Sequence, residues 1–145
     1  MAFRDERFRY LDHTADAKFQ AFGRTLEEAF SNAALATASL MWNVDAVERR
    51  KCRKVEVKGR DLEQLLLHFL GEVIYAFEVG SFYLAAVEGA RIERQEDGSY
   101  RFEAILVGDD TPSRYPLHGE VKAITYNEMK IETKDPVMVQ VVVDI

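Results

Sequence analysis

Four side chains that can bind a cation or carry a proton lie within one short stretch, LDHTADA: Asp12, His13, Thr14 and Asp16. Near the other end, Asp144 stands beside Ile145, whose main-chain carboxylate adds a second negative charge. Adjacent anionic groups repel each other unless a cation or a basic group lies close by. Hard divalent cations such as Ca²⁺ and Mg²⁺ accept carboxylate and carbonyl oxygens from distant parts of a chain. Asp16, Asp144 and Ile145 are therefore a candidate metal site, provided that the first and last strands are neighbours.

Simpler interpretations of these residues stay open on pattern alone. A chain with 25 acidic residues contains chance carboxylate pairs, and a terminal aspartate is usually just solvated. Asp12 and Asp16 have the residue type that caps a turn, and Thr14 can bond the local backbone. His13 with Asp16 has the composition of an acid/base pair, but geometry decides such arrangements. Zinc is the weaker choice of metal, because no further His or Cys ligand lies near His13.

Lys122 is a further candidate, within the stretch VKAITY. Strand alternation places Lys122 on the same side as Ile124 and Tyr126. If that side is buried, the ammonium must reach a carboxylate or extend outward to water. The alternative is an ordinary exposed lysine on a strand.

Two helices are indicated by their capping residues and by apolar residues at helical spacing. Thr25 with Glu28 precedes a stretch that runs to Trp42, and Asp61 with Gln64 precedes one that runs to Gly80. His68 lies at the edge of the second apolar stripe, where a structural role is expected.

Strands are predicted by alternating or continuous apolar residues, with a hairpin turn at Asp97 and Gly98. They fall at residues 17–22, around 55–57, and at 82–87, 90–95, 99–108, 121–126, 129–132 and 137–145. Residues 108–120 are predicted to form a loop, and the very apolar last strand should be central in its sheet. The order of elements indicates one α+β domain over residues 1–145, with a mixed or mainly antiparallel sheet packed with two main helices.

The composition excludes several classes of protein. With 48% hydrophobic residues the chain can form a real core, and the single Cys52 allows no internal disulfide. No secretory signal or membrane span is evident, so a soluble cytoplasmic protein is expected. The net charge of −6 argues against direct nucleic-acid binding. The basic residues 49–54 are interpreted as a charged strand edge.

Four stretches resemble the archease family, in the order in which they occur over residues 8–145: LDHTADAKFQAFGRTLEEAF, DLEQLLLHFLGEVIY, GEVKAITYNEMKI and VVVDI. The resemblance implies an accessory protein, not itself an enzyme, that activates the tRNA-splicing RNA ligase and so acts indirectly on tRNA exon halves. Such a protein promotes guanylylation of the ligase histidine and restores turnover.

The resemblance also implies a divalent metal, calcium with magnesium or manganese as alternatives, held by Asp16, Asp144 and Ile145. Asp12, His13 and Lys122 fall inside the matching motifs and are candidates for supporting the site or contacting the ligase. The chain departs from the common family pattern at Lys18, where many relatives have glycine, and at Asn127, where histidine is frequent.

Two other functions compete with ligase activation. One is a stand-alone metal-dependent phosphoester hydrolase that uses Asp16, Asp144 and His13, with the metal activating water. The chain lacks a recognised nucleophile motif, which counts against it. The other is a chaperone-like module, whose action would not depend on Asp16 or Asp144.

Overall fold

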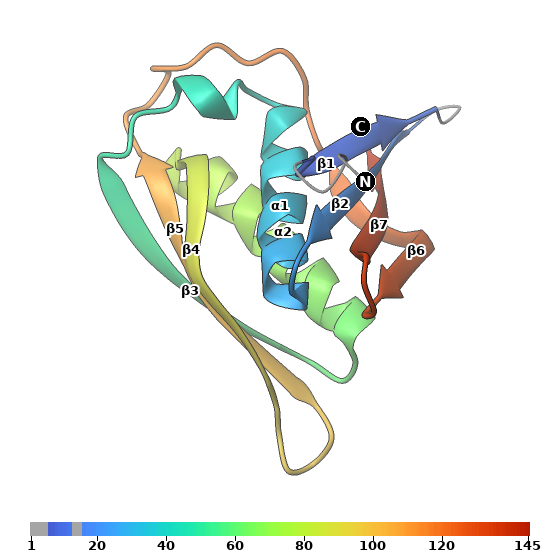
Figure 1. The fold of residues 1–145 in the computed structure, drawn as a ribbon. Coiled ribbons are helices and arrows are strands. Elements are labelled where there is room, and N and C mark those ends of the chain that lie inside the picture. The colour runs from blue at the N-terminus through green and yellow to red at the C-terminus, as the bar shows by residue number, and fades with distance from the viewer. Residues whose placement is uncertain (1–5, 13–15) are drawn as a thin grey trace.

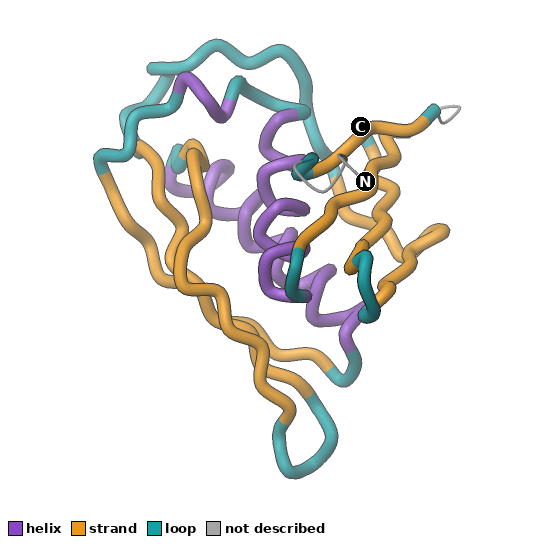
Figure 2. Tube along the Cα trace, viewed as in Figure 1, coloured by secondary structure: helices purple, strands orange, loops and turns teal. Residues whose placement is uncertain are grey.

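The computed structural model describes residues 6–12 and 16–145. Within these residues two α-helices form a middle layer between two antiparallel sheets (Figure 1, Figure 2). The four-stranded sheet has the order β1-β2-β7-β6, and the three-stranded sheet has the order β3-β5-β4. The strands are β1 Phe8–Leu11, β2 Ala17–Gly23, β3 Lys51–Gly59, β4 Tyr83–Arg94, β5 Tyr100–Asp109, β6 Ala123–Glu132 and β7 Val137–Asp144. The predicted α+β class, with mainly antiparallel strands and two main helices, is confirmed.

Both helices, α1 Leu26–Ser39 and α2 Leu62–Gly80, begin at their predicted capping residues. The Thr25 hydroxyl accepts a hydrogen bond from the Glu28 N–H at 3.1 Å, and the Asp61 carboxylate accepts one from the Gln64 N–H at 2.8 Å. These caps satisfy N–H groups that have no partner inside the helix.

The end of the first helix differs from the sequence prediction. α1 ends at Ser39 instead of Trp42, and a short 3₁₀ helix, Val44–Ala46, follows it. α2 ends at Gly80, as predicted, and the left-handed residue after it is Ser81, with a φ of 55°. Gly80 is therefore not the residue that turns the chain out of the helix.

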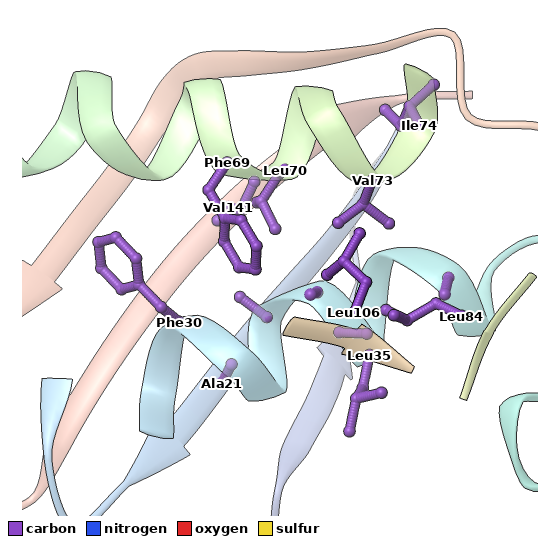
Figure 3. Close-up of a cluster of buried hydrophobic side chains, with 14 of the residues drawn as sticks. Ala21, Phe30, Leu35, Phe69, Leu70, Val73, Ile74, Leu84, Leu106 and Val141 are labelled. Carbon is purple, nitrogen blue, oxygen red and sulfur yellow. The ribbon is translucent and has the colours of Figure 1, made fainter. Parts of the chain in front are cut away.

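Aromatic side chains from both helices meet those of the three-stranded sheet in the core. The Phe69 ring centroid lies 4.2 Å from that of Phe102, and Phe30 contacts Phe102 at 5.7 Å. Phe69 and Leu70 of α2 point toward Val141 of β7 (Figure 3). α2 thus packs between the two sheets and fixes their relative position.

Two pairs of predicted strands are single strands. Residues 82–87 and 90–95 belong mostly to β4, in which Gly89 has a φ of 64° and the pairing with β5 shifts. Residues 123–126 and 129–132 belong to β6, whose pairing with β7 shifts between Thr125 and Lys130. The irregular residues interrupt the alternation and give one strand the sequence pattern of two.

The positions of three further strands bear on the predictions. β7 lies inside the four-stranded sheet, as its apolar sequence predicts, whereas β1 was not predicted. β3 is an edge strand, and the basic residues Lys51, Arg53 and Lys54 on it are exposed, as interpreted from sequence. No helix in the described part of the chain is long and apolar enough to cross a membrane.

Candidate functional site

The pairing of β2 with β7 brings the two ends of the candidate metal site together. The last pairs of these strands include Ala17 opposite Val143, so Asp16 and Asp144 occupy the next opposing positions. Figure 1 shows the C-terminus beside the N-terminal strands. The condition set by the sequence, that the strand at residues 17–22 and the last strand be neighbours, is met.

Asp16 and Asp144 belong to the sheet face that points away from the helices. Val139, Val141 and Val143 of β7 join the core, so alternation directs Asp144 to the opposite face. Asp16 shares that face by the same rule, because Ala17 packs against the core. Asp144 is exposed and Asp16 is half-buried, so the two acidic positions are open to solvent.

Lys122 lies at the same edge of the sheet but on the side of the helices. Its main-chain N–H donates to the carbonyl oxygen of Asp144 at 2.7 Å, and the register places it opposite Ile145. Its side chain is exposed and lines a depression beside Tyr75 of α2. Alternation with Ile124 is as predicted, and the ammonium extends to water at the sheet edge.

The remaining predicted residues are placed only in part. Asp12 is exposed directly after β1, whose residue Leu11 pairs with Lys18, so it lies at the same end of the sheet. His13 and Thr14 lie outside the described residues. Across residues 6–12 and 16–145, no three His, Cys, Asp or Glu side chains gather closely enough to hold a metal ion.

A polar network beside the two aspartates was not predicted. Lys18 lies two residues along β2 from Asp16, on the same face of the sheet, and places its Nζ 2.8 Å from Oε1 of Glu128. The Gln20 amide donates to the Gln140 side chain at 2.9 Å, and the Gln140 amide donates to the Glu128 carbonyl at 2.8 Å. Gln140 is only 3% exposed. This network, instead of a helix, covers the outer face of β7. It also places the positive charge of the Lys18 ammonium next to the two acidic positions.

Glu128 reaches this network because β6 bulges. Its φ is 54°, in the left-handed region, within the segment where pairing with β7 shifts. The sequence signal was the interruption of alternation by Asn127 and Glu128 between two strand-like runs. That break was interpreted as the gap between two strands, so the role of Glu128 was missed.

A buried acidic group outside the candidate site, Asp109, holds the loop that follows β5. Asp109 is 1% exposed and accepts hydrogen bonds from the Tyr115 hydroxyl at 2.7 Å and from the Thr111 N–H and hydroxyl at 3.0 and 2.8 Å. Burial raises the pKa of Asp109, but these hydrogen bonds and the charge of Arg114 outweigh it and lower the pKa to about 2. Asp109 is ionised at neutral pH and anchors the loop.

The other histidine and cysteine positions have ordinary environments. His68 Nδ1 lies 2.6 Å from the Lys58 carbonyl oxygen and links α2 to β3, which supports the structural interpretation. His118 links the loop after β5 to the end of α1, with Nε2 2.9 Å from the Ser39 carbonyl oxygen. Cys52 is exposed on β3.

Two helices enclosed by two antiparallel sheets, with an acidic pair where β2 and β7 meet, define a class of α+β protein. Known proteins share this arrangement of elements. The model of the Archease protein family (MTH1598/TM1083) matches residues 8–145. The chain is 40% identical over 149 residues to protein archease of Methanosarcina acetivorans, covering 100% of both. It is 42% identical over 141 residues to protein archease of Pyrobaculum neutrophilum, covering 95% of both.

A solved structure has the same fold. The solution structure of Methanobacterium thermoautotrophicum protein 1598 superposes with a TM-score of 0.80 at 30% sequence identity, covering 96% of this chain and 99% of that one. The chain belongs to the archease family.

Proposed function

We propose that this protein is an accessory protein of the tRNA-splicing RNA ligase, present in the cytoplasm, that promotes guanylylation of the ligase histidine and multiple turnover. Family membership supports this assignment. The single structural observation that carries it to particular residues is the opposed placement of Asp16 and Asp144 where β2 and β7 end. The protein does not act as an enzyme itself; it acts on the active site of the ligase and only indirectly on tRNA exon halves.

The residues at the shared end of β2 and β7, Asp16, Asp144 and Ile145, fit a hard divalent cation, and we call them the acidic edge. Asp16 and Asp144 offer carboxylate oxygens at opposing positions, and Ile145 adds main-chain oxygen at the same end. Oxygen donors suit calcium, with magnesium or manganese as alternatives. When bound, such a cation supplies positive charge that neutralises the acidic pair and can attract nucleotide phosphates.

The residues around the acidic edge have supporting roles. Lys18 and Glu128 link the bulge of β6 to β2 across β7, and the main-chain N–H of Lys122 donates a hydrogen bond to the carbonyl oxygen of Asp144. A rigid edge lets the protein bind one state of the ligase more tightly than another. Preferential binding to the guanylylation-competent state shifts the ligase toward it, which is sufficient for activation.

The test is ligation of RNA halves in large molar excess over purified ligase, with and without this protein. We expect faster guanylylation of the ligase and more products per ligase with the wild type. Asp16→Asn and Asp144→Asn should each lower the maximal stimulation. Glu96→Gln, at the exposed turn between β4 and β5, is the control with the same change in net charge. Absence of stimulation by the wild type would reject the proposal, and phosphoester hydrolysis by this protein alone would favour the hydrolase.

A further inference from the structure

Lys18 lies on the face of the four-stranded sheet that carries the two carboxylates of the acidic edge. Both helices lie on the other side of this sheet (Figure 1). The residues paired with Lys18 are Leu11 of β1 and Val142 of β7, which are both apolar. The Lys18 ammonium must therefore extend diagonally across the sheet to reach a carboxylate.

Asp16 and Asp144 lie within reach of this ammonium. Asp16 is two residues before Lys18, which on a strand is a separation of roughly 6.6 Å between Cα atoms. Asp144 is two residues beyond Val142, which makes it a diagonal neighbour of Lys18 at roughly 7–8 Å. The flexible four-carbon stem of lysine spans such a separation. The acidic edge and Glu128 therefore compete for one ammonium.

In the structure Glu128 holds the ammonium, with Nζ of Lys18 2.8 Å from Oε1 of Glu128. The ion pair passes over β7, where Val142 is only 1% exposed although alternation turns it away from the helices. The Gln140 amide donates to the Glu128 carbonyl oxygen, so Glu128 lies beside the middle of β7, four residues before Asp144. The ammonium is thereby drawn away from the end of the sheet at which the acidic edge lies.

The bulge of β6 brings Glu128 to this face. Had β6 kept the pairing that it has at Thr125, Glu128 would lie opposite Val139, whose side chain is in the core. The pairing shifts before Lys130 instead, and the φ of Glu128 is 54°, which is uncommon for residues other than glycine. Such backbone strain persists where the surrounding structure determines it, and it is frequent at functional sites. The outward position of Glu128 is thus a specific feature of this strand.

An ammonium that moved onto the acidic edge would weaken cation binding there. It would occupy carboxylate oxygens that a divalent cation uses as ligands. It would also place a like charge directly beside that cation. A carboxylate that holds the ammonium elsewhere removes this competition.

We propose that Glu128 is a positioning residue for the cation site. Its carboxylate holds the Lys18 ammonium away from Asp16 and Asp144 and so keeps the acidic edge open to a divalent cation. This inference rests on the proposed function and adds a residue that acts through Lys18 instead of binding the cation itself. Loss of the Glu128 carboxylate releases the ammonium to the acidic edge.

The experiment measures Ca²⁺ binding by calorimetry on the purified protein without ligase. The variants are Glu128→Gln, Lys18→Met and the double variant, with circular dichroism to check the fold. We expect Glu128→Gln to weaken Ca²⁺ binding about threefold or more, because the released ammonium competes for the acidic edge. In the Lys18→Met background the same substitution should change the affinity by less than about twofold.

Glu132→Gln is the matched control. Glu132 is exposed on the same strand, opposite Met138 at the other end of the sheet, and its replacement makes the same change in net charge. It should bind Ca²⁺ as the wild type does.

A crystal structure of Glu128→Gln without Ca²⁺ gives a direct readout of the ammonium. We expect Nζ of Lys18 within hydrogen-bond distance of a carboxylate oxygen of Asp16 or Asp144. An ammonium that stays over β7 in this variant would contradict the proposal.

The outcomes separate this inference from the proposed function. Equal losses of Ca²⁺ affinity with and without Lys18 would mean that Glu128 acts on the cation directly, and the positioning role would be wrong. No loss in Glu128→Gln, or no Ca²⁺ binding by the wild type, would also overturn it. Stimulation of the ligase by the wild type would leave the proposed function standing in each of these cases. If the expected coupling is found but the ligase is not stimulated, the positioning role stands and the proposed function is wrong.

Discussion

Lys18 and Glu128, 110 residues apart in the sequence, form an ion pair across β7, with Nζ of Lys18 2.8 Å from Oε1 of Glu128. The Lys18 side chain is 18% exposed, so the pair is partly shielded from solvent. The ion pair joins β2 to the bulge of β6, and Lys18 lies two residues along β2 from Asp16. A lysine at this position therefore both holds the sheet face together and places a positive charge next to the acidic edge.

Replacement of Lys18 should strengthen cation binding at the acidic edge while weakening the fold slightly. Lys18→Met keeps most of the aliphatic stem but removes the ammonium that offsets Asp16 and Asp144. We expect Ca²⁺ affinity to rise several-fold and the free energy of unfolding to fall by up to about 1 kcal/mol. Calorimetric Ca²⁺ titration and urea unfolding measure the two effects.

The control is Lys134→Met, because Lys134 is exposed in the turn between β6 and β7, at the other end of the sheet. It makes the same change in net charge. Equal gains in Ca²⁺ affinity for both variants would show that overall charge, not the position of Lys18, is responsible.

The buried Asp109 carboxylate should make stability depend on pH in the acid range. Its pKa is about 2 in the folded protein, against about 3.9 in the unfolded chain. Because the folded pKa is the lower one, the stabilisation is fully present above about pH 4 and is lost as the pH falls toward 2. Urea unfolding of the wild type should show a falling midpoint across this window.

Asp109→Asn should flatten this dependence and lower stability at pH 7. The neutral amide cannot form the ion pair that the carboxylate forms with Arg114. Its NH₂ group would also face hydrogen-bond donors, such as the Tyr115 hydroxyl, that now donate to the carboxylate. Asp110→Asn, at the exposed neighbouring position, should retain the wild-type profile. A profile for Asp109→Asn as steep as that of the wild type would assign the acid sensitivity to other groups.

Truncation of Phe69 should produce the large loss of stability expected at the junction of helix and sheet. Phe69 is fully buried against Phe102. We expect Phe69→Ala to lower the free energy of unfolding by about 3–5 kcal/mol, through lost burial and the cavity left behind. Tyr75→Ala removes an exposed ring from the same helix and should change it by no more than about 0.5 kcal/mol. Similar losses in urea unfolding for the two variants would contradict this placement of the core.

The helices and β7 could be predicted because their signals are local. Capping at Thr25 and Asp61 involves residues three apart, and an apolar run such as 137–143 indicates a buried strand by itself. The bulge at Glu128 could not be predicted, because a left-handed residue inside a strand breaks the alternation as a turn does. The same holds at Gly89 in β4.

The candidate site was predictable by residue type but not by geometry. Asp16 and Asp144 are chemically suited to a cation, yet their approach depends on β2 pairing with β7 in one particular register. A shift of one residue would turn the apolar residues of either strand away from the core. The buried alternation of Phe19 and Ala21 against Val139 and Val141 selects the observed register and so brings the acidic pair together.

Because that register places Asp16 opposite Asp144, the two carboxylates should bind one cation together. We expect Ca²⁺ to raise the thermal unfolding midpoint of the wild type, since a ligand at one hundred times its Kd adds about 2.7 kcal/mol to the free energy of unfolding. Asp16→Asn and Asp144→Asn should each abolish most of this shift, and the double variant should lose little more, because either loss alone dismantles the site. Asp135→Asn, an exposed acid in the turn at the far end of β7, should keep the wild-type response. Additive losses in the single and double variants would instead indicate two independent weak sites, and no shift in the wild type would remove the metal from the proposal.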